Sequence, residues 1–192
     1  MGSSDPMSIV RDHAARELGG LGDTAMVEPL VTAFVDRAHR EDDAKGAAYA
    51  LGVLGDRRGV DALLDGLADG WKSQVLIEVL PAAGRTTVVA IVDRALREPA
   101  IAARRGVISV LESIPWDQLH VVLDPKLAAL GVDAEAATRG TALLRLAAAH
   151  GDLEKAVARR LLAHPFDDTT PGRALAKAAR KVLDPPPPKP KR

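Results

Sequence analysis

The sequence predicts an all-α protein built from stacked helix pairs, an α-solenoid. Leu-Gly-Gly-Leu-Gly-Asp at residues 18–23 recurs as Leu-Gly-Val-Leu-Gly-Asp at residues 51–56, a period of 33 residues. Self-similarity at such a period is typical of repeat proteins, in which each unit is too small to bury its own apolar face. The composition agrees, because 47% hydrophobic residues with only 3% aromatic residues suit a core of alanine, leucine and valine between closely packed helices.

The first helix pair begins at residue 9. Apolar and small residues recur at helical spacing over residues 9–18, which predicts a helix, and the glycines of residues 19–22 end it. Asp23 or Thr24 is expected to cap the next helix, because a short side-chain oxygen accepts a hydrogen bond from a free backbone N–H group. Its predicted buried face consists of four apolar residues, Val27, Leu30, Val31 and Phe34.

The second pair repeats this scheme one period later. Asp42 or Asp43 is expected to cap a helix that runs through residue 51, and residues 52–55 are expected to form the turn. Glycines suit that turn because they allow positive φ angles and close backbone approach. The apolar face recurs 33 residues on, at Val60, Leu63, Leu64 and Leu67.

Beyond residue 69 the spacing becomes irregular. Residues 80–85 replace the turn signature, and Gly151-Asp152 echoes the Gly-Asp ending of the earlier turns. Thr170 before Pro171 predicts the start of a final helix that caps the stack, because proline is well tolerated in a first helical turn. Helices are expected in residues 88–96, in the pair 101–114 and 116–130, in the pair 134–150 and 153–162, and in residues 172–183.

The expected organisation is one repeat domain, residues 8–184, between two irregular ends. Residues 1–7 are interpreted as a disordered or expression-derived N-terminus. Residues 185–192, Pro-Pro-Pro-Pro-Lys-Pro-Lys-Arg, favour extended polyproline conformations and are expected to be a disordered tail. This tail fits both a linker and a proline-rich ligand, and the sequence leaves the two interpretations open.

The repeat resembles a known family. Ala14-Ala15 and Ala47-Ala48 each precede the hexapeptide at the same distance. This pattern, over residues 9–69, resembles the HEAT-like repeat of the phycobilisome-lyase type. The resemblance implies a right-handed superhelix of about five antiparallel helix pairs plus a C-terminal capping helix, with the second helix of each pair lining the concave side. It also implies an interaction scaffold rather than a lyase.

Several classes of function find no support in the composition. The 26 basic and 26 acidic residues cancel, and there is no cysteine to form a disulfide or a thiolate metal site. The five histidines are scattered without metal-ligand spacing, so neither a metal nor a cofactor is expected. The glycine-rich segments lack the lysine of a phosphate-binding loop. No apolar stretch is long enough to span a membrane, and a cytoplasmic location is expected.

A row of acidic residues is the leading candidate for a binding site. Asp61, Asp65 and Asp69 are four residues apart, so they share one side of a helix away from its leucines. Glu28, Thr32 and Asp36 occupy the equivalent positions one repeat earlier. We expect these residues to form an acidic strip that binds another protein, whose identity the sequence does not give. A solvated helix face is the alternative interpretation.

Two other functions remain open. Residues 97–192 carry 16 basic and 11 acidic residues, against 10 and 15 in residues 1–96. The basic half allows nucleic-acid binding, with glycosylase-like chemistry suggested by Trp116-Asp117. The alternative for that pair is an aromatic side chain packed at a helix start beside a capping aspartate. A chromophore lyase or isomerase is the third hypothesis. The candidate nucleic-acid-binding residues are Arg94, Arg97, Arg104, Arg105 and Arg139.

Overall fold

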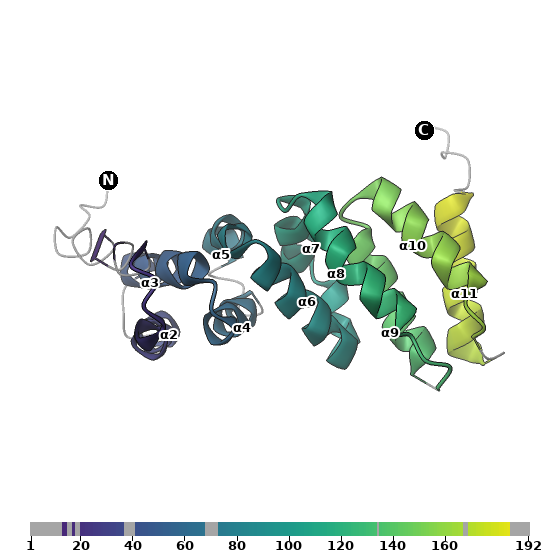
Figure 1. The fold of residues 1–192 in the computed structure, drawn as a ribbon, viewed down its shortest axis with the longest axis horizontal. Helices are drawn as coiled ribbons and strands as arrows, with labels where there is room; N and C mark the ends of the chain where they lie inside the picture. The colour runs from purple at the N-terminus through teal and green to yellow at the C-terminus, as the bar shows by residue number, and fades with distance from the viewer. Residues whose placement is uncertain are drawn as a thin grey trace, which may run out of the picture. The chain divides into compact units, whose positions relative to one another are not determined.

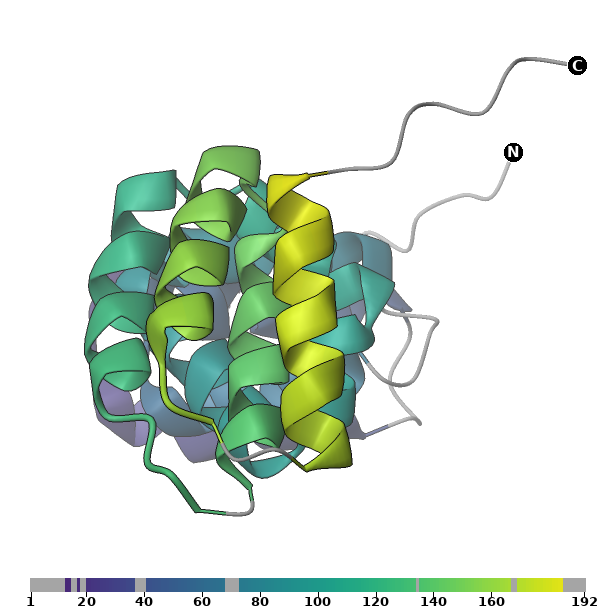
Figure 2. The same cartoon turned by 90° about the vertical axis from the view of Figure 1, so that its right-hand side faces the viewer.

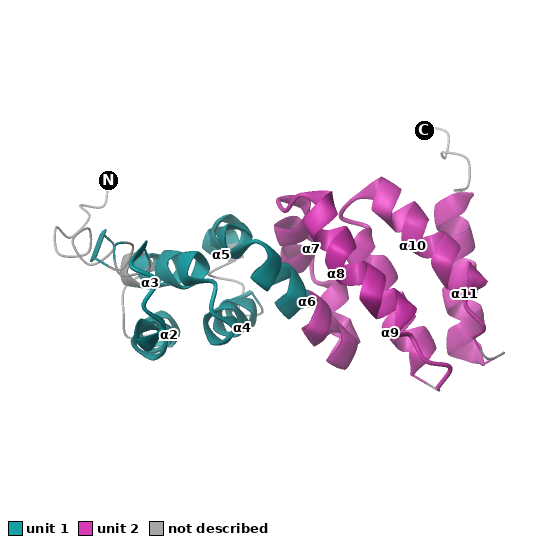
Figure 3. Ribbon diagram, viewed as in Figure 1, with its two compact units in different colours: residues 1–91 teal, residues 92–192 magenta. Residues whose placement is uncertain are grey.

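The computed structural model describes most of the chain as helices. The described residues are 13–14, 17, 20–36, 41–67, 73–133, 135–166 and 169–184, and their regular structure is helical throughout (Figure 1). They form two compact units, residues 1–91 and 92–192 (Figure 3). The predicted all-α fold class is confirmed. Most of the helix expected in residues 9–18, together with residues 1–7 and 185–192, lies outside the described residues.

The first unit stacks its helices in two layers. In Figure 1, α2 and α4 lie in one layer and α3 and α5 in the other, and each helix packs against its neighbours in both layers. A short 3₁₀ turn precedes α2, and another precedes α6. The elements are η1 (Thr24–Met26), α2 (Val27–Val35), α3 (Glu41–Leu54), α4 (Arg57–Gly66), α5 (Ser73–Val79), η2 (Leu80–Ala83) and the start of α6 (Arg85–Arg97).

The predicted apolar register is present in both repeats. Seven of its eight side chains are buried, and Val31 is half-buried. Burying each such side chain contributes roughly 1.5–3 kcal/mol, so this shared face supplies much of the unit's stability. The buried residues of the two faces are Val27, Leu30 and Phe34 in α2 and Val60, Leu63, Leu64 and Leu67 at α4.

The Gly-Asp pair of the hexapeptide forms the same turn twice. Gly22 and Gly55 have φ angles of 71° and 62°, which favour glycine. The next residue, Asp23 or Asp56, is an N-cap whose side chain accepts from the backbone N–H two residues on, at 2.9 Å in both repeats. Asp23 therefore caps η1, the short turn that leads into α2, whereas the N-cap of α2 itself is Met26, which makes no side-chain cap hydrogen bond.

Two details of the second repeat differ from the prediction. Helix α3 already includes Glu41, so Asp42 and Asp43 lie in its first turn and do not cap it. Gly52 lies inside α3 rather than in the turn. A Cβ atom there would lie 2.6 Å from Val79 Cγ1 and 2.9 Å from Val79 O, so this glycine is required for close packing.

Residues 80–87 have a buried polar contact in place of the Gly-Asp turn. Gly84 has a φ angle of 51°, as in the earlier turns, but no aspartate follows it. Thr87 is fully buried in the first turns of α6, and its hydroxyl donates to Leu80 O at 2.6 Å. This bond satisfies both groups and connects α6 to η2.

The second unit is also built of packed helices. Helices α8 to α11 pack consecutively, and α11 also packs on α9 (Figure 2). The expected final helix therefore covers two preceding helices of this unit. The elements are η3 (Pro99–Ala103), α7 (Arg105–Glu112), α8 (Trp116–Ala128), α9 (Ala136–Ala147), α10 (Gly151–Ala163) and α11 (Thr170–Leu183).

The structure corrects three boundaries here. The helix expected in residues 101–114 is broken, because Arg104 has an extended backbone between η3 and α7. Gly151 begins α10 and is not among the positive-φ glycines of the described residues, so it does not reproduce the earlier turn. Thr169, not Thr170, caps α11, and its hydroxyl accepts from Gly172 N at 3.3 Å.

Candidate functional site

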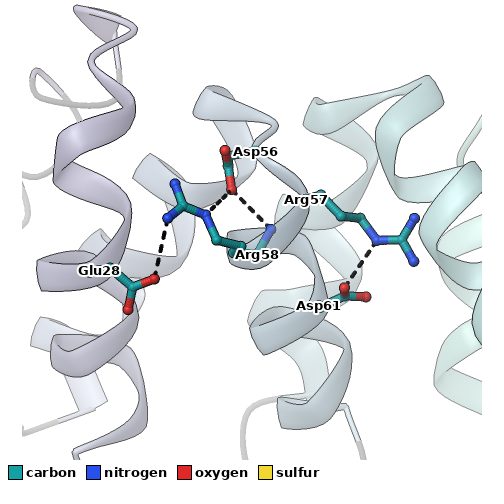
Figure 4. A network of polar contacts seen from close by, with 5 residues as sticks. All are labelled: Glu28, Asp56, Arg57, Arg58 and Asp61. Atoms are coloured by element: carbon teal, nitrogen blue, oxygen red, sulfur yellow. Dashed lines mark hydrogen bonds and ion pairs between the residues drawn. The ribbon is translucent and has the colours of Figure 1, made fainter.

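The layer of α2 and α4 carries a network of charged side chains across the two repeats. Arg58 Nη1 lies 3.5 Å from Glu28 Oε1 on α2, while Arg58 Nε donates to Asp56 Oδ1 at 3.1 Å. Figure 4 shows the Arg58 side chain extending from the start of α4 toward α2. Arg58 therefore connects the cap of one repeat to the surface of the previous one.

The same network includes an ion pair along α4. Arg57 Nε donates to Asp61 Oδ2 at 3.0 Å, four residues away, and both side chains are about one-third exposed (36% and 38%). Asp61 Oδ1 is buried and has no hydrogen-bond partner among the described residues. In Figure 4, Arg57 points away from α2, so Arg57 and Arg58 diverge from consecutive positions.

Hydrogen bonds from Arg58 shift the pKa of the capping residue Asp56. The side-chain hydrogen bond from Arg58 lowers the pKa of Asp56 below its usual value, although partial burial opposes this, and the backbone bond from Arg58 acts in the same direction as the guanidinium. The reciprocal hydrogen bond raises the pKa of Arg58. Both groups are therefore charged over the whole neutral range.

The predicted acidic residues are only partly brought together. Glu28 and Asp65 are exposed and Asp61 is half-buried, while Asp36 is the exposed C-cap residue of α2. The hydroxyl of Thr32 donates to Glu28 O at 2.9 Å. Asp69 lies outside the described residues. Arg57 and Arg58 pair with two members of this row, so the surface is of mixed charge rather than uniformly acidic.

Sequence reasoning missed Arg57 and Arg58 as members of this surface. Arg57 precedes Asp61 by four residues, a spacing that pairs opposite charges on a helix, so this contact had a sequence signal. Arg58 had none, since its partner Glu28 is 30 residues away. Only the packing of α4 beside α2 brings these two side chains together.

The candidate nucleic-acid-binding arginines are partly engaged by carboxylates. Arg139 Nη2 donates to Asp133 Oδ2 at 2.7 Å, and Arg139 Nη1 lies 3.6 Å from Glu135 Oε2. The hydrogen bond from Arg139 also lowers the pKa of Asp133. Arg94 Nε lies 3.7 Å from Glu98 Oε1.

The other candidate arginines lie near the start of α7 and at the end of α6. Arg105 and Arg97 are exposed, and Arg104 is the half-buried residue before α7. The five arginines thus come from three helices and the residue before α7.

The Trp116-Asp117 pair does not pack as expected. Trp116 is 59% exposed and makes an edge contact with His120, with ring centroids 5.9 Å apart. Pro115 occupies the N-cap position, so Asp117 lies in the first turn rather than capping α8. The expectation of a packed aromatic beside a capping aspartate is therefore wrong.

Two histidines connect helix ends within the second unit. His150 Nε2 lies 3.1 Å from Leu111 O and 3.0 Å from Ile114 O, and His164 Nε2 lies 2.8 Å from Leu130 O. Carbonyl oxygens only accept, so Nε2 carries the hydrogen in both rings. Within the described parts of the chain, no three histidine or acidic side chains are grouped as metal ligands.

Among the described residues, no single helix is long and apolar enough to cross a membrane. One bent pair, Gln74–Ala83 with Arg85–Arg97, meets the length and composition criteria only when combined, and its two parts are bent by 112°.

Comparison with known families agrees with this helical architecture. Residues 44–69, which include most of α3 and all of α4, match the family model of the PBS lyase HEAT-like repeat. The match confirms the resemblance of this segment to a HEAT-like repeat of this type. Repeats of this kind generally mediate protein–protein interaction. No curated protein and no solved structure gives a significant match.

Proposed function

We propose that the protein is a non-enzymatic scaffold that binds another protein through the layer of α2 and α4. The observation that supports this proposal best is that α2 and α4, which occupy equivalent positions in the two repeats, lie side by side and both carry exposed charged side chains. Their apolar residues are buried in the core, whereas Glu28, Arg58 and Asp65 are exposed. These charges are therefore available to a partner without disturbing the packing.

The Arg58–Glu28 contact gives the surface a defined arrangement. It holds an arginine of one repeat against a glutamate of the previous repeat, which limits the conformations that both side chains sample. Charged groups across a protein interface determine partner choice and association rate more than affinity itself. A partner of this surface is expected to present both basic and acidic residues in a matching order.

Nucleic-acid binding has weaker support. Arg94 and Arg139, two of the five candidate arginines, face carboxylates of their own chain. A phosphate backbone would have to displace those carboxylates.

A double charge reversal tests the proposal. Glu28→Lys with Asp65→Lys is expected to reduce partner recovery in quantitative affinity purification with crosslinking, and to weaken the affinity of the recovered partner. The matched control is Asp152→Lys, a reversal of an exposed carboxylate on α10. Circular dichroism checks that both variants remain folded. Equal recovery by the double variant, the control and the wild type would refute the role of this surface.

A further inference from the structure

An apolar groove in the second unit is separate from the charged α2/α4 layer. It has a volume of about 690 Å³ and is lined by four alanines together with Ile108, Leu144 and Val182. These residues come from η3, α7, α9 and α11. The groove therefore extends across several elements of one unit, as a site for an extended or helical segment does.

Two helices contribute to the groove in the same way. Arg145 of α9 and Ala148, the C-cap residue of α9, line it three residues apart. Ala178 and Lys181 of α11 have the same spacing. Residues three or four apart share one side of a helix, so each helix presents a small apolar residue beside a cation. Alanine side chains leave room for another backbone to approach closely.

The two cations of the groove have no carboxylate partner within the described residues. Arg145 and Lys181 are both exposed, and neither forms an ion pair there, unlike Arg139, Arg160 and Lys126 of the same unit. Glu154 of α10 also lines the groove and is half-buried. The groove thus combines an apolar lining with an excess of unpaired positive charge.

We propose that this groove binds an amphipathic helical segment of a partner protein that carries acidic residues beside its apolar side. Its apolar side chains would lie against the alanines, Ile108 and Val182, and its carboxylates would pair with Arg145 and Lys181. Helix-in-groove recognition uses apolar residues at positions i, i+3, i+4 and i+7 as anchors. The apolar lining disfavours a phosphate backbone as the occupant.

The chain's own C-terminal residues are a poorer match by charge. Residues 185–192 contain Lys189, Lys191 and Arg192 and no acidic residue. They would bring three positive charges toward Arg145 and Lys181. An acidic segment of another protein removes that repulsion and pairs both cations.

Selection from a peptide display library tests the proposal on the full chain. The probes are helical peptides with a fixed leucine side and flanking positions that vary among Glu, Gln and Lys. We expect enrichment of Glu-flanked peptides. Reversal of both cations, by Arg145→Glu with Lys181→Glu, should lower the affinity for the enriched peptide about tenfold, as measured by fluorescence anisotropy, since each exposed ion pair contributes a few-fold to the affinity. The same variant should favour the Lys-flanked version.

Filling the groove gives a second, independent measurement. Ala148→Trp places a large ring at an exposed position of the groove and should abolish peptide binding. Ala174→Trp, at an exposed position of α11 that does not line the groove, is the matched control. Circular dichroism verifies that each variant is folded.

Four results would overturn the proposal. These are no enrichment, enrichment of Lys-flanked peptides, binding that survives Ala148→Trp, and binding that rises when residues 185–192 are removed. The last would show that the chain's own tail occupies the groove. None of them depends on Glu28 or Asp65, so failure here and failure of the α2/α4 proposal are separate outcomes.

Discussion

Substitutions of Asp56 distinguish the contribution of its helix cap to stability from the contribution of its charge. Asp56 Oδ1 accepts from Arg58 N at 2.9 Å and from Arg58 Nε at 3.1 Å, so one oxygen serves both the helix end and the guanidinium. Asp56→Ala removes both interactions. Loss of an N-cap alone costs about 1 kcal/mol, within a range of roughly 0.5–2 kcal/mol. Asp56→Asn should cost clearly less, because asparagine caps as well as aspartate and only the charge is lost.

The first repeat provides a matched comparison. Asp23 caps η1 in the same geometry, but Ala25 stands where Arg58 stands in the second repeat. Asp23→Ala should therefore lose only the cap, and Asp23→Asn should be nearly silent. Urea unfolding followed by circular dichroism gives the free energies, and hydrogen exchange at the Arg58 amide reports the local cap directly.

The pH dependence of the Asp56 effect has a defined sign. Hydrogen bonding to Arg58 lowers the folded-state pKa of Asp56 below its ordinary value of 3.8. The ionised group therefore stabilises the fold above that value, and this contribution disappears as the pH falls through the lowered folded-state pKa. The difference between wild type and Asp56→Asn should be constant from pH 5 to 8 and shrink below about pH 4. Equal losses for Asn and Ala, or a difference that grows on acidification, would refute this reasoning.

Two further changes test the backbone and the helix ends. Gly55→Ala should lower the free energy of unfolding in urea by about 1–2 kcal/mol, because the φ angle of 62° is unfavourable for alanine. Gly151→Ala should be tolerated, because Gly151 lies at a helix start with open space around it; equal effects of the two substitutions would contradict this account. His150→Ala should lower the free energy of unfolding by about 1–3 kcal/mol, because two backbone carbonyls lose their hydrogen-bond donor. His120→Ala should cost little, because the His120 ring is partly exposed beside Asp124. Equal melting temperatures of the two variants would contradict the structural role of His150.

The sequence predicts the repeat well where local chemistry determines the structure. The Gly22 and Gly55 turns follow from a backbone conformation that other residues avoid, and the cap at Asp23 follows from a free N–H group beside a short acceptor. The predicted turn role of Gly52 is wrong, because glycine is required there by the close approach of Val79, 27 residues away. Contacts of that kind depend on how α3 packs and leave no local pattern.

The candidate surface was harder to predict for the same reason. Helical spacing places Asp61 and Asp65 on one side of α4, but the spacing does not show which cations lie among them. Arg58 reaches Glu28 only because α4 packs beside α2. A row of like charges in the sequence thus becomes a mixed surface in the fold.

The repeat separates the residues that build the fold from those that distinguish its surface. Gly22 and Asp23 are identical to their equivalents one period later, and both aspartates accept a hydrogen bond from the backbone N–H two residues on. Thr32 is replaced by Asp65 in the second repeat, and both positions are exposed. A partner that distinguishes the two repeats must contact such variable positions, because the identical residues form the turns and caps. Substitutions at the variable positions should therefore change binding while stability is retained, which allows charge reversal to be interpreted as a test of recognition.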